Sequence, residues 1–314
     1  HSTDAGISWA PQFTTGQTLL RIKFFDSVSG LAVGDNGSIY STNNSGTNWT
    51  QVTSGTTMGL NDILFVSLTD FLISGDNGTL LHSTNAGSNW SDQSLSTYAS
   101  LNGIAAAPNL LFAVGENGVL ARRIGTSSWN FLNSGDNRAI NWITFYDFLN
   151  GWGVGQYGII LHTTDGGKTW SEQVNGITGD SFYGAEAADA NNMWTVGDLG
   201  VLLHTSDAGQ HWVQQSTYTT NTLLSVSFID NLHCWVVGDV GELLQTVNGG
   251  NLWTHKSSGV SDILFGVKFK SILTGWIVGD NGIIRKTTDG GNSWNSQSSG
   301  VTDALFSVDF LDAQ

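Results

Sequence analysis

A repeat of about 40 residues runs through the 314-residue chain and limits what it can fold into. Its clearest marker is a tryptophan that recurs every 39 to 42 residues, at Trp9, Trp49, Trp90, Trp129, Trp170, Trp212, Trp253 and Trp294. A period in this range is typical of folds in which each repeat is one supersecondary unit. Such a unit cannot bury its apolar face alone, so neighbouring repeats must pack on one another.

Each repeat contains four short segments that alternate apolar and polar residues, as in 19–26, 30–35, 38–42 and 48–54. This alternation predicts four β-strands per repeat, here called a, b, c and d. The b–c connection reads VGDNG at 33–37, with near copies in the six following repeats. Asn and Gly accept the positive φ angles of a tight hairpin, so the sequence predicts one such turn in every repeat.

Four-stranded units that must stack on one another favour radial repetition, because it leaves only short, protected sheet edges. The predicted fold is therefore all-β, a β-propeller of four-stranded blades over a single domain, 1–314. Seven repeats of about 41 residues are complete, and a partial eighth is divided between the two ends of the chain. Its segments, 1–13 and 305–312, are predicted to hold unpaired strands that could join copies of the chain into a polymer or filament.

The segment before each marker tryptophan reads S/T-x-D/N-x-G-x-x-W, as in TTDGGKTW at 163–170. It resembles the Asp-box, or BNR, repeat, and 275–294 resembles the photosystem II assembly-factor-like and sialidase-like propellers. This resemblance implies the propeller fold but not one function, since Asp-box propellers include hydrolases, receptors and binding modules. We interpret the acid or amide as structural, accepting hydrogen bonds from its own turn: Asp4, Asn44, Asn85, Asp165, Asp207, Asn248 and Asp289.

Six of the seven b–c turns carry an acidic residue, and Gln156 takes its place in the seventh. In Asp-box propellers these turns and the d–a loops form the face that is usually functional. Two interpretations stay open, a good turn residue or a face that attracts cations or a basic partner. The acidic residues are Asp35, Asp76, Glu116, Asp198, Asp239 and Asp280, and the longest d–a loops add Arg138, Asp180, Phe182 and Tyr183 as candidates.

Charge and composition argue against several classes of protein. A net charge of −15 would repel phosphate backbones, so no nucleic-acid partner is expected. No apolar run approaches the ~20 residues of a membrane helix, so no membrane insertion is expected. The single Cys234 cannot form an internal disulfide. His1, His82, His162 and His204 recur at one place in the repeat, which separates them in space, so no metal and no cofactor are expected.

The sequence also indicates no enzyme. The five arginines fall mostly on predicted strands, whereas a sialidase needs three that grip a carboxylate. Asp62, Asp262 and Asp303 lie in d–a connections, but a xyloglucanase-type enzyme forms its cleft from two propellers.

Low Lys content and many Ser, Thr and Asn residues favour a non-catalytic propeller, secreted or on the cell surface, that acts as an interaction or structural module with a protein partner. A carbohydrate-binding or glycoside-hydrolase-type propeller is one alternative. A photosystem-type assembly factor is the other, although the basic patch of that family is hard to find in so acidic a chain. The start at His1 suggests a mature or excerpted piece of a longer protein.

Overall fold

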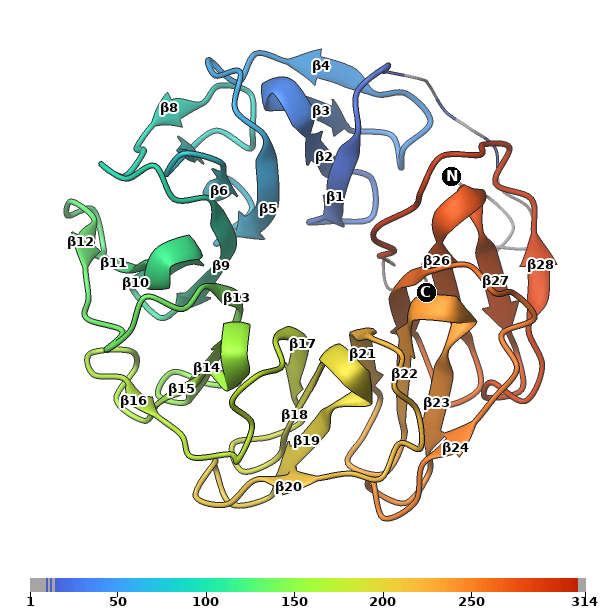
Figure 1. The fold of residues 1–314 in the computed structure, drawn as a ribbon. Helices are drawn as coiled ribbons and strands as arrows, with labels where there is room; N and C mark the ends of the chain where they lie inside the picture. Colours follow the sequence, from blue (N-terminus) through green and yellow to red (C-terminus); the bar gives the residue numbers. More distant parts are fainter. Residues whose placement is uncertain (1–9, 11, 13–14, 310–314) are drawn as a thin grey trace. The chain divides into compact units, whose positions relative to one another are not determined.

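The computed structural model describes residues 10, 12 and 15–309, and nearly all of their regular structure is β-strand. These residues form seven four-stranded sheets, each with its strands in the order a, b, c, d. The predicted β-propeller of four-stranded blades is therefore confirmed, and the described residues make seven blades, a number that the sequence left open between seven and eight. The chain falls into two compact units, built mainly on Gln12–Leu149 and Asn150–Val308. Figure 1 labels their strands. The prediction of a single domain over 1–314 stays a prediction.

The first unit holds blades 1 to 3 and the first strand of blade 4. Its strands are β1 (Leu19–Phe24), β2 (Gly30–Gly34), β3 (Ser38–Thr42) and β4 (Thr50–Val52); β5 (Leu60–Phe65), β6 (Phe71–Gly75), β7 (Leu80–Ser83) and β8 (Ser91–Asp92); β9 (Leu101–Ala107), β10 (Leu110–Gly115), β11 (Leu120–Ile124) and β12 (Asn130–Phe131); and β13 (Ile140–Phe145).

The second unit holds the rest of blade 4 and blades 5 to 7. Its strands are β14 (Gly151–Gly155), β15 (Ile160–Thr163) and β16 (Ser171–Glu172); β17 (Phe182–Ala187), β18 (Met193–Gly197), β19 (Leu202–Thr205) and β20 (Val213–Gln214); β21 (Leu223–Phe228), β22 (Cys234–Gly238), β23 (Leu243–Thr246) and β24 (Thr254–His255); and β25 (Leu264–Phe269), β26 (Gly275–Gly279), β27 (Ile284–Thr287) and β28 (Asn295–Gln297).

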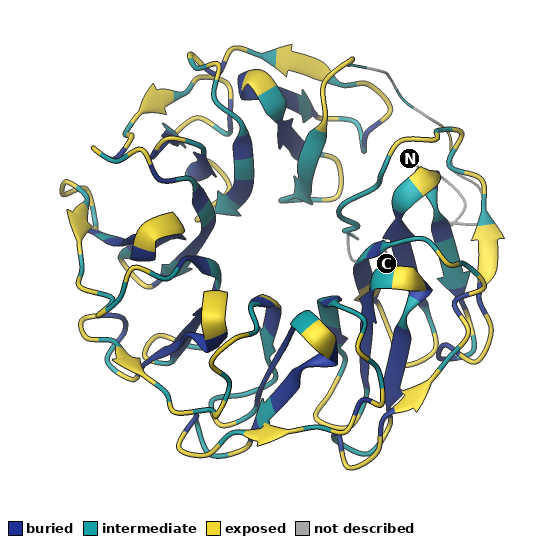
Figure 2. Cartoon of the chain, viewed as in Figure 1, coloured by how far each residue is buried: buried dark blue, intermediate teal, exposed yellow. Residues whose placement is uncertain are grey.

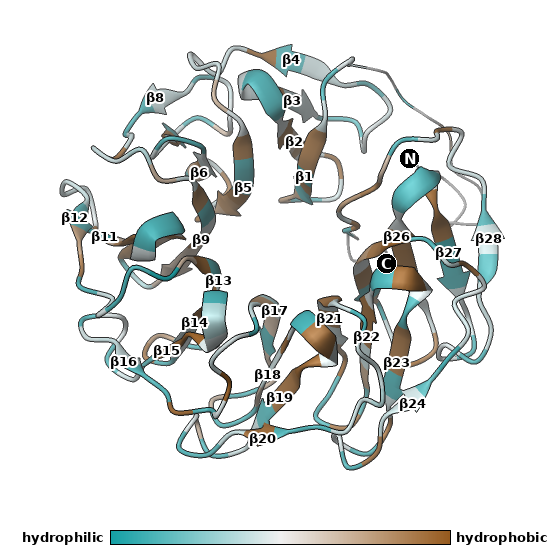
Figure 3. Ribbon diagram, viewed as in Figure 1, coloured by the Kyte–Doolittle hydropathy of each residue, from teal (hydrophilic) through white to brown (hydrophobic). Residues whose placement is uncertain are grey.

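The core of each unit lies between successive blades. Every residue of the b strands β2, β6, β14, β18, β22 and β26 is buried, whereas the d strands are mostly exposed (Figure 2). In the first unit, Val33 of blade 1 and Ile63 of blade 2 belong to one apolar cluster, with Trp90 packed against it. Hydrophobic segments are accordingly found on a and b strands such as β9, β21 and β26 (Figure 3). Stacking therefore buries the apolar faces that a lone blade would expose.

The b–c turns have the conformation that their sequences predict. In blade 1 the turn is η1 (Asp35–Gly37), where Asn36 and Gly37 have φ angles of 53° and 66° and the N–H of Ser38 donates to the carbonyl oxygen of Asp35. Two successive positive φ angles define the turn that fits the twist of a hairpin. Equivalent turns are η2 (Glu116–Gly118), η3 (Gln156–Gly158), η4 (Asp198–Gly200), η5 (Asp239–Gly241) and η6 (Asp280–Gly282).

The predicted eighth blade falls largely outside the described residues, since only Ala10 and Gln12 of 1–13 are described. In the second unit, 305–308 forms no strand, yet it lies where the a strand of a following blade would lie. The N–H of Leu305 donates to the carbonyl oxygen of Gly279 at 3.0 Å, and the Phe306 ring lies 4.8 Å from that of Phe265. Assembly through the termini stays a prediction.

Candidate functional site

The b–c turns and the d–a loops meet in each unit, as the sequence analysis expects. In blade 1, the N–H of Gly37 donates to the carbonyl oxygen of Met58, 2.8 Å away in the d–a loop. The same loop is held at its end by the next blade, where the N–H of Asp76 donates to the carbonyl oxygen of Gly59. Each d–a loop is therefore held by hydrogen bonds between two successive b–c turns. We call the surface that the b–c turns and d–a loops form the turn face.

The six acidic turn residues are not equivalent. Asp198 accepts the N–H of Ser181 at 3.0 Å and the hydroxyl of Tyr183 at 3.0 Å. Glu116 accepts the N–H of Ser100, and Asp76 accepts the amide of Asn61. These three carboxylates fasten a turn to the end of a d–a loop or to the start of the a strand that follows it.

The remaining three acids differ in what their carboxylates contact. Within the described part of the chain, the carboxylates of Asp35, Asp239 and Asp280 accept no hydrogen bond, although each backbone N–H donates to the start of an a strand. The structural interpretation therefore covers Asp76, Glu116 and Asp198. A role in attracting cations or a basic partner stays a prediction for the others.

The loop candidates do not gather into one site. Arg138 donates through Nε to Asp136 at 2.8 Å, in the first unit. In the second unit, Asp180 is half-buried and its backbone carbonyl accepts the N–H of Gly158. Phe182 is fully buried at the start of β17, where it fills a core position and is out of reach of a ligand. Tyr183 is exposed on the turn face; burial of its ring and the neighbouring Asp198 carboxylate raise the pKa of its hydroxyl.

The Asp-box residues act within their own turns. Asp165 accepts the backbone N–H groups of Lys168 and Thr169 and the hydroxyl of Thr163, which itself accepts the N–H of Gly167. These bonds bring the pKa of the Asp165 carboxyl down to about 2 despite some burial. The same pattern recurs at Asn44, Asn85, Asp207, Asn248 and Asp289. Asp4 and Trp9 lie outside the described residues.

A second set of tryptophans, which the sequence analysis did not single out, forms the centre of the packing. Trp152, Trp194, Trp235 and Trp276 stand on b strands and are at most 3% exposed. Each stands three residues before the glycine that opens the b–c turn. This fixed position in the repeat is the sequence pattern from which their shared place in the fold could have been predicted.

The marker tryptophans of the Asp-boxes pack beside this second set. Trp253 meets Trp194 edge to face, with ring centroids 5.7 Å apart. Trp253 and Trp294 are buried, and Trp49, Trp90, Trp129, Trp170 and Trp212 are half-buried.

The repeated histidines also pack on the b-strand tryptophans. His204 stacks on Trp194 at a centroid distance of 3.7 Å, and His162 stacks on Trp152 at 4.5 Å. Burial lowers the pKa of His204 to about 4 and lowers that of His162. Among the residues that the structure describes, no group of three or more His, Cys, Asp or Glu side chains could hold a metal ion.

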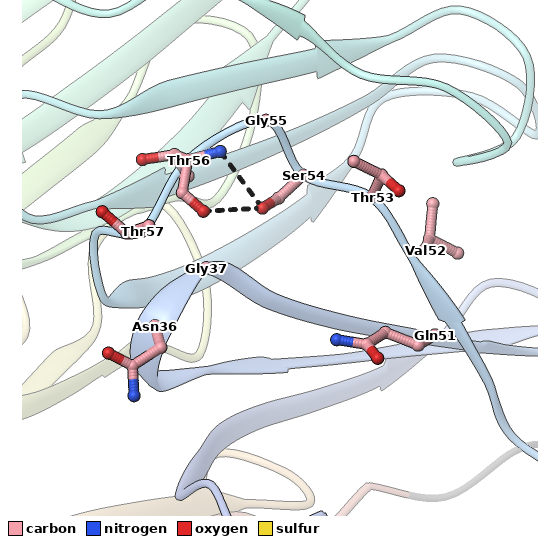
Figure 4. A pocket seen from close by; sticks show the side chains of 9 residues that line it. All are labelled: Asn36, Gly37, Gln51, Val52, Thr53, Ser54, Gly55, Thr56 and Thr57. Atoms are coloured by element: carbon pink, nitrogen blue, oxygen red, sulfur yellow. Dashed lines mark hydrogen bonds between the residues drawn. The ribbon is translucent and has the colours of Figure 1, made fainter.

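A shallow hollow opens on the turn face of blade 1. It is lined by Asn36 and Gly37 of the turn and by 51–57 of β4 and the d–a loop (Figure 4). Ser54 is one of the lining residues. Its hydroxyl accepts the backbone N–H of Thr56 and donates to the Thr56 carbonyl oxygen. The lining contains no ionisable side chain, so the hollow offers hydroxyl and amide groups for hydrogen bonds but no general acid or base.

The carboxylates considered for glycoside hydrolysis make other contacts. Asp62 is buried in β5 and lies 3.3 Å from Lys23 and 3.9 Å from Arg21. Asp262 accepts the amide of Asn281 at 2.7 Å. We find no helix in the described ranges that is long and apolar enough to cross a membrane.

Comparison with known families gives one match along most of the chain. The family model described as photosynthesis system II assembly factor YCF48 matches residues 2–123, 121–217 and 211–300. No curated protein matches the sequence significantly.

Solved structures of similar fold include two of that factor. A structure described as YCF48 bound to D1 peptide is 18% identical, with a TM-score of 0.62 over 76% of this chain and 81% of the other. YCF48 from Cyanidioschyzon merolae is 17% identical, with a TM-score of 0.62 over 78% and 86%. The computationally designed Ika8 protein is 11% identical, with a TM-score of 0.78 over 94% and 91%. At such identities the likeness is one of fold.

Proposed function

Because this chain belongs to the photosynthesis system II assembly factor YCF48 family, we propose that it is an assembly factor that binds a segment of a client protein. The observation that carries the proposal is the family match, which runs through every blade. One structure of similar fold is described as YCF48 with a D1 peptide, so a peptide segment is the class of ligand we propose here.

The expectation of a secreted or cell-surface protein is wrong, because the family is one of photosystem II assembly factors. The prediction was based on composition. A chain rich in Ser, Thr and Asn indicates solubility and many turns, but it does not indicate where the protein is located. Of the functions that the sequence left open, the assembly factor is therefore the better supported.

We propose a non-catalytic role for the chain. The support is that several of the candidate acids make structural contacts, as Asp62 does with Lys23 and Asp198 does with Ser181 and Tyr183. A general acid or base must be able to reach the proton that it transfers.

The test is binding to peptides that tile the D1 sequence, each compared with a scrambled peptide of the same composition. We expect at least one native segment to bind more tightly than its scrambled form, measured by fluorescence anisotropy. Equal binding of native and scrambled peptides along the whole D1 sequence would refute the proposal.

A further inference from the structure

Four exposed side chains of the second unit stand where most of the other blades have Asn or Gly. Three are the middle residues of b–c turns, and the fourth lies in a d–a loop. All four have left-handed backbone conformations: Tyr157 (φ 50°), Leu199 (φ 51°), Tyr218 (φ 55°) and Val240 (φ 56°). We call them the apolar turn patch.

The turns themselves do not require these side chains. Asn36, Asn77, Asn117 and Asn281 occupy the same position in the other blades, with φ angles of 52° to 55°. Backbone geometry is therefore the same with either kind of residue. Asn tolerates the left-handed region, whereas a bulky or β-branched side chain such as Val240 is an outlier there.

Tyr218 departs from the repeat in the same way. It follows Thr217, whose hydroxyl donates to the carbonyl oxygen of Gly200 at 2.8 Å. In blades 3 and 6 the matching hydroxyls of Ser134 and Ser258 bond the turn glycine, and the next residues are glycines with φ angles of 84° and 76°. A Cβ atom built on the blade 3 glycine, Gly135, meets nothing within 4 Å, so a side chain at this loop position has no neighbour to pack on. The loop therefore forms without a tyrosine.

The four side chains point away from the core. Their exposed fractions are 55% for Tyr157, 64% for Leu199, 83% for Tyr218 and 63% for Val240. Figure 3 shows brown segments on η4 and η5, whereas η1, η2 and η6 are hydrophilic. Exposed apolar groups add little to a hydrophobic core, and backbone strain of this kind is concentrated at functional sites.

The turns that carry the patch are neighbours, because the d–a loops join one turn to the next. The loop that carries Tyr218 bonds the blade 5 turn through Thr217 and the blade 6 turn through the N–H of Asp239, which donates to Thr222. The preceding loop joins the turns of Tyr157 and Leu199 in the same way, through Asp180 and Ser181.

The charge around the patch selects its partner. Leu199 and Val240 directly follow Asp198 and Asp239, and the Asp239 carboxylate accepts no hydrogen bond from the described residues. We propose that the apolar turn patch binds a protein segment in which apolar side chains alternate with Lys or Arg. Apolar contacts would supply the affinity, and the acids would select against acidic segments. Where that segment is part of a client protein, the inference rests on the proposed function.

The test uses a variant that gives each position the residue of the other blades: Tyr157→Asn, Leu199→Asn, Tyr218→Gly and Val240→Asn. This change leaves the net charge unaltered. Three peptides are compared by anisotropy: alternating Leu and Lys, alternating Leu and Glu, and alternating Ser and Lys. We expect the Leu/Lys peptide to bind the native chain best and the variant at least tenfold more weakly. The urea midpoint of the variant should rise, which separates lost binding from lost folding.

A control variant, Asn36→Gly, Asn77→Gly and Asn117→Gly, changes the same turn position in the first unit and should bind the Leu/Lys peptide normally. Equal binding by the native chain and the patch variant would overturn the proposal, as would equal binding of the Leu/Glu peptide. A dimer in sedimentation that the patch variant loses would also overturn it, since the occupant would then be a second copy.

The D1 peptides separate this inference from the proposed function. If a D1 segment binds the native chain and the patch variant alike, the proposed function stands and the patch inference fails. If the Leu/Lys peptide binds through the patch but no D1 segment binds, the patch inference stands and the proposed function fails.

Discussion

The indole Nε1 of Trp235 donates a hydrogen bond to the backbone carbonyl oxygen of Gly290, 3.2 Å away. Trp235 belongs to the b strand of blade 6 and Gly290 to the Asp-box turn of blade 7, so the bond joins two successive blades. The buried indole lies beneath the turn, and a Cβ atom on the next glycine, Gly291, would lie 2.9 Å from its Nε1. This contact explains why the second residue after the Asp-box acid Asp289 is a glycine, Gly291, in blade 7.

We therefore expect Gly291→Ala to destabilise the chain by about 2 kcal/mol, from a left-handed backbone and a steric clash together. Gly176→Ala is the matched control, because Gly176 also has a positive φ but has nothing within 4 Å of a built Cβ. Urea midpoints of the two variants measure the difference. Equal losses would show that the indole yields at no cost.

The marker tryptophans should be packing residues. Trp294 is 8% exposed and meets Phe269 edge to face at 5.8 Å. Trp294→Ala should cost about 3–5 kcal/mol of unfolding free energy. Tyr98 is an aromatic side chain with 94% exposure, so Tyr98→Ala should change the free energy by less than about 0.5 kcal/mol. A loss of similar size in both variants, measured by denaturant unfolding, would contradict the packing role.

The acidic turn residues should separate into two groups. Asp198→Ala removes the acceptor for Ser181 and Tyr183 and should cost about 1–2 kcal/mol. Asp239→Ala removes a carboxylate without hydrogen bonds to described residues and should change stability by less than about 0.5 kcal/mol. Thermal unfolding of both variants at one pH checks this. A large loss for Asp239→Ala would assign that carboxylate a structural role as well.

As pH falls, the stability of the fold should first decrease because of the stacked histidines, at pH values above those at which carboxylates are protonated. Burial lowers the pKa of His204 in the folded chain from 6.5 to about 4. The unfolded chain therefore binds a proton between these two values that the folded chain refuses, so stability falls as pH drops from about 6.5 to about 4. We expect a loss on the order of 1–2 kcal/mol for this residue.

His204→Phe keeps an aromatic ring beside Trp194 and should flatten the pH dependence in that window. Urea midpoints at pH 7.5 and 4.5 give the measurement. His162 remains in the variant, with a pKa lowered in the same direction, so part of the dependence should persist. An unchanged pH dependence in the variant would show that His204 does not carry it.

A structural feature could be predicted from the sequence where its motif recurs from one repeat to the next. The hairpin turn and the Asp-box recur in nearly every blade, so their local chemistry could be recognised, and strands such as β2 and β3 end within a residue of the predicted ranges. The core position of Trp194 could not be predicted in this way. It depends on close packing against Gly250 of the next blade, and no local sequence pattern shows which residues of two blades meet.

The candidate site was harder to predict, because it consists of departures from the repeat. Leu199 and Val240 were visible only as unremarkable apolar residues inside a hairpin motif. Their meaning depends on two quantities that the structure supplies, a positive φ angle and an exposed side chain. Phe182 shows the opposite case, because a residue beside a long loop proved to be the first core residue of a strand.

The left-handed turn position allows a reciprocal exchange between blades 6 and 7. Val240 and Asn281 have φ angles of 56° and 55°, and both are exposed, but the Asn281 amide also donates to Asp262 at 2.7 Å. Val240→Asn should raise the unfolding free energy by about 1 kcal/mol. Asn281→Val should lower it by about 2 kcal/mol, because it introduces the same strain in blade 7 and also removes that hydrogen bond. The double exchange keeps the composition and charge of the chain and should lower stability by about 1 kcal/mol, the part due to the lost hydrogen bond. Denaturant midpoints of the two single variants and the double variant test this. If Val240→Asn lowered stability, the valine would be a packing residue of the fold and not a side chain exposed for binding.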